Sequence, residues 1–134
     1  MKKIRTIVDR DVRTLSVYQK SLELIDRVKA IHDALPWREK EVLGDQIWRA
    51  ATSIAGNISE ANAQVYVSVS FRQLNSALGS AGEVSTWLEI LCRCKYIDQN
   101  TFNSLFEKAM EIRRMLIGML KKLMVEMEDE IEVA

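Results

Sequence analysis

Apolar residues recur at spacings of three and four over most of the chain, and this pattern predicts amphipathic helices. The first segment opens near Thr14 and ends before Leu35 and Pro36. A second segment begins after Pro36, and its apolar positions alternate in spacing between four and three, as in a coiled-coil seam rather than a strand. These positions are Leu43, Ile47, Ala51, Ile54, Ile58 and Ala61.

The second helix is predicted to continue through residues 53–61, although Gly56 and Asn57 disfavour helix interiors. Ala55 and Gly56 are expected to thin one side of this helix so that a neighbouring helix of the bundle can approach closely. Asn57 is expected to be largely buried and hydrogen-bonded to backbone or to a neighbouring helix end. An unpaired amide there would cost about 1–3 kcal/mol.

Residues 62–70 alternate valines with polar residues, as a strand would, but the chain offers such a strand no partner. We therefore interpret them as a connection, with helix resuming over the later part and Ser68 or Ser70 as a candidate cap. The third helix follows from Phe71 to Cys92, and its internal Gly79 and Gly82 predict close approach by a neighbour.

A break over residues 95–101 separates the third helix from the last one, which is predicted to run from Phe102 to Met127 with Asp98 as its cap. Four helices with short joints favour an all-α, antiparallel up-and-down four-helix bundle. We expect one domain over residues 1–134, with the core at about 13–127, a basic segment at 1–13 and an acidic tail at 126–134.

Large apolar side chains exceed what the inner seams of one bundle need, and such residues on an outer face are typical of subunit contacts. A wide core that absorbs them is the alternative. The candidate oligomer interface consists of Trp37, Trp48, Trp87, Ile117, Leu120 and Met124.

The formal net charge is zero, so the chain as a whole gives no electrostatic argument for nucleic acid or an anionic membrane. Charge is nevertheless concentrated at both ends, where solvated termini are the simpler explanation. A basic face could also form from the N-terminal cations together with those on the predicted helices, although an ordinary solvated surface has similar spacings. The candidate nucleic-acid-binding residues are Lys2, Lys3, Arg5, Arg10, Arg13, Arg27, Lys29, Arg49 and Arg72.

Catalytic and metal-binding patterns are missing from the sequence. Cys92 and Cys94 are too closely spaced on a helix for an unstrained disulfide, and His32 is the only histidine. No phosphate-binding loop and no Glu-x-x-His pair occurs. We expect a protein that is not an enzyme, has no cofactor, metal or small-molecule substrate, and is cytoplasmic, because no long apolar run predicts a membrane span.

Residues 46–60, read with LSVYQKSLEL at 15–24 and LNSALGSAGEVSTWLEILCRCKYI at 74–97, resemble the 23S rRNA intervening-sequence protein family. The family pattern of an Arg-Ala pair, Ser-Ile, two small residues, Asn-Ile and Glu falls on Arg49, Ser53, Gly56, Asn57 and Glu60. Two departures are that Ala61 stands where the family has Gly, and that related retroelement proteins tend to be basic.

The family is similar to the accessory variability determinants of diversity-generating retroelements. The resemblance implies a four-helix subunit in a homopentameric ring and, for the retroelement branch, binding to a reverse transcriptase and to RNA or DNA. Two hypotheses follow. The first is an accessory scaffold that binds nucleic acid, a reverse transcriptase or both, and the second is a structural oligomer that binds a protein partner only.

Overall fold

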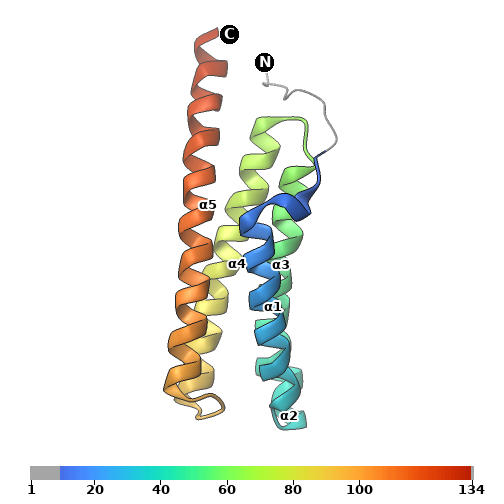
Figure 1. Cartoon of the computed structure of the whole chain (residues 1–134), viewed down its shortest axis with the longest axis vertical. Helices are drawn as coiled ribbons and strands as arrows, with labels where there is room; N and C mark the ends of the chain where they lie inside the picture. Colours follow the sequence, from blue (N-terminus) through green and yellow to red (C-terminus); the bar gives the residue numbers. More distant parts are fainter. Residues whose placement is uncertain (1–9, 134) are drawn as a thin grey trace.

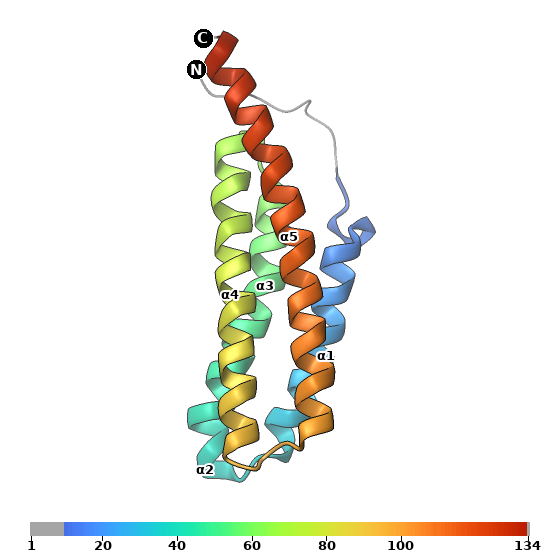
Figure 2. The same ribbon diagram turned by 90° about the vertical axis from the view of Figure 1, so that its left-hand side faces the viewer.

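The computed structural model describes residues 10–133, with side chains described from Arg10 to Glu128. Four long helices pack side by side, as predicted: α1 (Ser16–Ala34), α3 (Asp45–Asn62), α4 (Val67–Arg93) and α5 (Gln99–Val133). Consecutive long helices run in opposite directions, and α1 packs against α3 and α5 (Figures 1 and 2). The all-α four-helix bundle predicted from the sequence is confirmed.

The core consists of the apolar seams that the spacing identified. Ile47, Ile54 and Ile58 of α3 are fully buried, and they pack in the same cluster as Leu88 of α4 and Ile112 of α5. Two ion pairs align α1 antiparallel to α5. The Lys20 ammonium lies 2.9 Å from the Glu111 carboxylate, and the Lys108 ammonium lies 2.6 Å from that of Glu23.

The second predicted helix is not one regular helix. It begins as the short α2 (Trp37–Glu39), continues as a π-helical segment η2 (Lys40–Gly44) and becomes α3 at Asp45. Gly44 is buried in this segment, where a Cβ would lie 2.8 Å from Cδ2 of His32. The glycine is therefore needed because the ring of His32 occupies the space that a side chain would take.

The predicted boundaries around α4 need correction. The connection between α3 and α4 covers only residues 63–66, because Val67 and Ser70 are buried on the inner face of α4. Neither predicted serine caps the helix. The N-cap residue is Tyr66, and the Ser70 hydroxyl donates instead to the carbonyl of Ala61 at 2.9 Å, which ties the start of α4 to the end of α3.

The last helix is longer than predicted. It begins at Gln99 rather than Phe102, and Asp98 caps it, as expected, by accepting a hydrogen bond from the Thr101 amide at 2.7 Å. The ion pairs place the start of α1 opposite the region of Met115, yet α5 runs on to Val133. These 18 further residues extend α5 by about 27 Å, and its end projects beyond the other helices (Figures 1 and 2).

The predicted close approach at Gly56, Gly79 and Gly82 is wrong within the subunit. A Cβ built at each of these positions would meet no heavy atom within 4 Å. Ala55 is buried, but Gly56 and Gly79 are exposed. The packing of this bundle therefore gives no reason for glycine at these three helical positions.

Candidate interaction surface

The residues of the sequence motif form one stripe on α3. Arg49, Ser53, Gly56, Asn57 and Glu60 are spaced at four, three, one and three, which places them on one side of a helix. Arg49, Gly56 and Glu60 are exposed, and Ser53 and Asn57 are half-buried. The stripe therefore lies outside the core, on the side of α3 that adjoins α4.

A chain of hydrogen bonds joins this stripe to α4. The Asn57 amide donates to the carbonyl oxygen of Ser53 at 2.9 Å and to its hydroxyl oxygen at 3.0 Å. The Ser80 hydroxyl donates to the Ser53 hydroxyl at 2.9 Å. The predicted hydrogen bonding of Asn57 to backbone is confirmed, whereas its burial is only partial because the amide lies at the outer edge of the α3 and α4 contact.

Gly56 and Gly79 flank this chain of hydrogen bonds. The Ser53 to Ser80 bond fixes the antiparallel register, so Gly56 and Gly79 lie within about one helical turn of each other along the bundle. We define the α3–α4 face as Ser53, Gly56, Asn57, Gly79 and Ser80. Its side chains are polar, and its two exposed glycines each destabilise a helix by roughly 0.5–1 kcal/mol relative to alanine.

The candidate interface residues do not form one patch. Trp37 is 69% exposed at the end of the bundle near α2, while Ile117 and Met124 are exposed on α5 towards its other end. Trp48 and Trp87 are half-buried and pack against the core, and the buried indole nitrogen of Trp87 has no hydrogen-bond partner among the described residues. Leu120 is itself a core residue at 8% exposure.

The cations at the start of the described chain are engaged in local contacts. The Arg10 guanidinium donates to the carbonyl of Asn62, the last residue of α3, at 3.2 Å, and to that of Gln64 in the following connection at 2.9 Å. Arg13 pairs with Asp11 at 2.7 Å, and hydrogen bonds from the Arg13 side chain and backbone lower the pKa of Asp11. The candidates Lys2, Lys3 and Arg5 lie outside the described residues.

The helical cations are divided between the two ends of the bundle. Lys29 is paired with Asp33 at 2.6 Å, whereas Arg27, Arg49 and Arg72 are exposed and form no ion pair with another described residue. Arg49 lies in the second turn of α3 and Arg72 in the second turn of the antiparallel α4, so the two are at opposite ends. The described candidates for nucleic-acid binding are therefore not brought together on a single face of the subunit.

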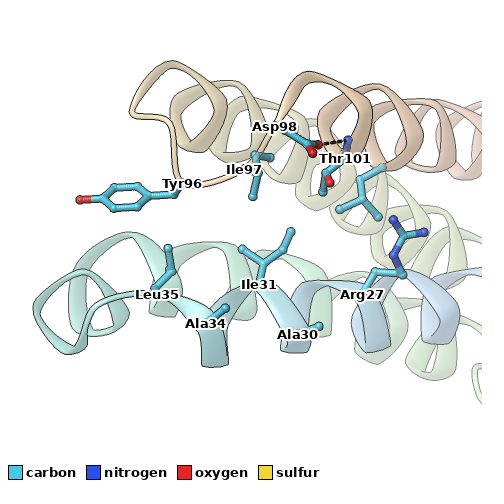
Figure 3. Close-up of a pocket in the computed structure, with 10 residues that line it drawn as sticks. Arg27, Ala30, Ile31, Ala34, Leu35, Tyr96, Ile97, Asp98 and Thr101 are labelled. Carbon is cyan, nitrogen blue, oxygen red and sulfur yellow. Dashed lines mark hydrogen bonds between the residues drawn. The ribbon is translucent and has the colours of Figure 1, made fainter.

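Arg27 contributes instead to a pocket of about 430 Å³ between α1 and the start of α5. Figure 3 shows the Arg27 side chain extending from α1 towards α5, with Asp98 and Thr101 on the opposite wall and the Tyr96 ring directed away from them. Ile31, Leu35, Ile97 and Leu105 make part of the lining apolar. The hydrogen bond from the Thr101 amide holds the Asp98 carboxylate as a helix cap, and it lowers the pKa of Asp98.

Over the described residues, no three His, Cys, Asp or Glu side chains are grouped as metal ligands would be. No helix in that part of the chain combines the length and the apolar character needed to cross a bilayer. Cys92 is half-buried and Cys94 is exposed, and both are free thiols, as predicted.

Comparison with protein families gives a match to the 23S rRNA-intervening sequence protein family over residues 13–118. The chain belongs to this family. The family match thus covers the motif stripe on α3 and most of the bundle, and it ends before the last part of α5. The comparison with curated proteins gave no significant match.

A solved structure has the same fold. It is a protein of unknown function from the S23 ribosomal protein family of Bacteroides thetaiotaomicron, determined at 1.70 Å. The chain is 37% identical to it, with a TM-score of 0.73 over 78% of this chain and 98% of the other. The resemblance deduced from residues 46–60 and the flanking helices is therefore confirmed at the level of family and fold.

Two residues of the surface were not identified from the sequence. Ser80 was not singled out, because a serine in an amphipathic helix carries no signal that a hydroxyl on another helix is its partner. Arg10 was considered only as a charge, although its main contacts are backbone carbonyls 52 and 54 positions away. Both contacts depend on the packing of α3, which local spacing does not encode.

Proposed function

We propose that this protein is a non-enzymatic, self-associating accessory subunit that serves as a scaffold for nucleic acid, for a reverse transcriptase, or for both. The family resemblance favours a homopentameric ring as the assembly. The role corresponds to that of an rRNA intervening-sequence protein or an accessory variability determinant of a retroelement.

The observation that carries the self-association is the α3–α4 face. A Cβ at Gly56 or Gly79 would meet no described heavy atom outside its own helix backbone within 4 Å, so glycine at these positions does not serve the packing of the subunit. Alanine at each position would favour the helix by roughly 0.5–1 kcal/mol. A surface that keeps glycine against that preference suits close contact with a second copy, and Asn57 and Ser80 offer polar groups for such a contact.

The test is the mass of the protein in solution, measured by light scattering for the natural chain and for two matched variants. Gly56→Leu places a large side chain on the α3–α4 face and is expected to lower the oligomer mass. Gly118→Leu adds the same side chain at a helical glycine of α5, outside this face, where a Cβ also meets no described heavy atom of a neighbouring element within 4 Å, and it is expected to assemble normally. A natural chain that is monomeric at all concentrations would contradict the proposal.

Arg27, Arg49 and Arg72 support the nucleic-acid part, because they are exposed cations without ion pairs among the described residues. In a ring of identical subunits each of these cations is repeated, so separate arginines become a circular series of positive sites. Phosphate binding by such sites weakens as salt rises. The expected result is binding to a structured RNA that weakens steeply between low and physiological salt.

A variant with Arg27→Gln, Arg49→Gln and Arg72→Gln is expected to bind the RNA more weakly and with a shallower salt dependence. A control that removes the same charge is Arg13→Gln with Arg93→Gln and Arg114→Gln, since these arginines are already paired with Asp11, Glu89 and Glu107. Binding that is undetectable even at low salt would reject the nucleic-acid role. If the protein is fully assembled and still binds no RNA, the remaining hypothesis is a structural oligomer that binds only a protein partner.

The second hypothesis is a structural oligomer that binds only a protein partner. It is favoured by the zero net charge and by the ion pairs that already engage many cations. Those pairs include Arg13 with Asp11, Lys20 with Glu111, Lys29 with Asp33, Lys108 with Glu23 and Arg114 with Glu107.

A further inference from the structure

An apolar groove lies beside the part of α5 that α1 does not cover. It encloses about 560 Å³ and is lined by Leu15 and Val17 at the start of α1, Leu74 of α4, and Met115, Met119 and Leu123 of α5, together with Ser16, Gly118, Lys122 and Glu126. Helix α1 begins at Ser16, and the chain before it leads to Arg10 at the end of α3. Among the described residues, no helix continues the line of α1 along this part of α5.

The groove has the composition of an interrupted core. Leu74 and Leu123 are buried at its base, and Met115 and Met119 are half-buried on its wall. Between the lining residues Leu123 and Glu126, α5 carries the exposed Met124 and Val125, at 49% and 57%. Methionine side chains adapt readily to the shape of a bound apolar segment.

Charge at this end of α5 is predominantly negative. From Lys121 to Val133 the helix carries five carboxylic residues and two lysines, and Glu126 lies in the lining of the groove itself. Residues 1–9 have the opposite character, with the three cations Lys2, Lys3 and Arg5 against the single carboxylate of Asp9. Ile4, Ile7 and Val8 in the same segment are spaced at three and four, as for one face of a helix.

Residues 1–9 are also attached to the described chain at the same end of the bundle as the groove. Arg10 is held at the α3 to α4 connection by its bonds to Asn62 and Gln64, and the connection lies at the end of the bundle beyond which α5 projects (Figure 1). Nine residues reach at most about 30 Å when extended. That length exceeds the bundle cross-section of two helices, at 8–10 Å between axes, so the groove is within reach.

We propose that residues 1–9 bind in this groove of their own subunit, with Ile4, Ile7 and Val8 against the apolar lining and the cations beside the carboxylates of α5. The family match covers only residues 13–118, so the segment and the acidic end of α5 both lie outside it. The basic segment 1–9 and the acidic end of α5 thus both lie outside the matched region, and each combines its charges with apolar residues. The N-terminal cations are then neutralised within the subunit rather than free for nucleic acid.

The test is disulfide formation in the full chain, with Cys92→Ser and Cys94→Ser as the background. Ile7→Cys combined with Met119→Cys is expected to form an intrachain disulfide on mild oxidation, detected by mass spectrometry of peptides. The matched control combines Ile7→Cys with Arg72→Cys, a residue exposed on α4 near the same end of the bundle. The groove pair should form the intrachain bond severalfold more than the control pair.

Charge variants measured in the same disulfide assay test the electrostatic part of the proposal. Glu126→Lys with Glu128→Lys is expected to reduce the intrachain disulfide of the groove pair severalfold, while Glu107→Lys, on an exposed part of α5 away from the groove, should leave it unchanged. Equal cross-linking of groove and control pairs would overturn the proposal. So would a disulfide of the groove pair that joins only different chains, because the groove would then hold a second copy.

Discussion

The contact between Gly44 and His32 gives the sharpest prediction about stability. Gly44→Ala would place a methyl carbon 2.8 Å from Cδ2 of His32 and 3.3 Å from Cδ1 of Leu35. The imidazole cannot simply turn away, because its Nε2 lies 3.1 Å from the Asp45 carboxylate and its Nδ1 lies 3.3 Å from that of Asp33. Leu35 is buried at 6% exposure.

The expected magnitude follows from two opposing effects. Overpacking of this kind typically costs about 1–3 kcal/mol, and replacing glycine by alanine in a helix returns roughly 0.5–1 kcal/mol. Gly44→Ala should therefore lower the free energy of unfolding by up to about 2.5 kcal/mol. Gly82→Ala has no heavy atom within 4 Å of its new methyl group and should instead raise the free energy of unfolding, by up to about 1 kcal/mol.

Urea unfolding followed by circular dichroism, at several protein concentrations, measures both variants against the natural chain. The added substitution His32→Ala in the Gly44→Ala background should recover part of the loss, because it removes the nearest clashing atoms. If Gly44→Ala were as stabilising as Gly82→Ala, the reasoning would be refuted, since the ring would then move aside at no cost.

Three further predictions concern the helix ends. Asp98→Ala should destabilise the protein at pH 7, because the hydrogen bond from the Thr101 amide lowers the pKa of Asp98 in the folded state. This stabilisation is present above the unfolded-state pKa of about 3.9 and is lost as pH falls through the lower folded-state pKa. The difference between variant and natural chain in the free energy of unfolding should therefore be smaller at pH 3 than at pH 7. Ser70→Ala removes the buried bond to the Ala61 carbonyl and should cost about 1–3 kcal/mol in thermal or urea unfolding, with the exposed Ser76→Ala near neutral. Arg10→Gln should cost about 1–2 kcal/mol and speed hydrogen exchange at residues 63–66, whereas unchanged exchange there would show that the bonds of Arg10 to Asn62 and Gln64 do not hold the connection.

The helices were predictable because burial repeats with the period of a helix. Ile47, Ala51, Ile54, Ile58 and Ala61 were identified as one seam, and all five are buried. Asp98 was identified as a cap because a carboxylate before an apolar periodic segment is a local signal. Such signals need no knowledge of the neighbouring helices.

Features that depend on neighbours were predicted poorly. Val65, Val67 and Val69 alternate like a strand, but burial of Val67 against the other helices determines that α4 begins there. Gly56 was expected to be in a close contact within the bundle and is exposed, while Gly44 has the close contact and was not singled out. A glycine carries no side-chain signal for what lies opposite, so its role is visible only once the helices are placed.

The π-helical segment η2 also determines the direction in which Trp37 faces. Trp37, Gly44 and Ala51 are spaced seven apart, and on one regular helix they would share a side, yet Ala51 is fully buried and Trp37 is 69% exposed. A π turn accommodates one residue more than an α turn, which rotates everything before it by about 100°. On a regular helix Trp37 would face the core. With the one inserted position it is the most exposed large apolar side chain among the described residues.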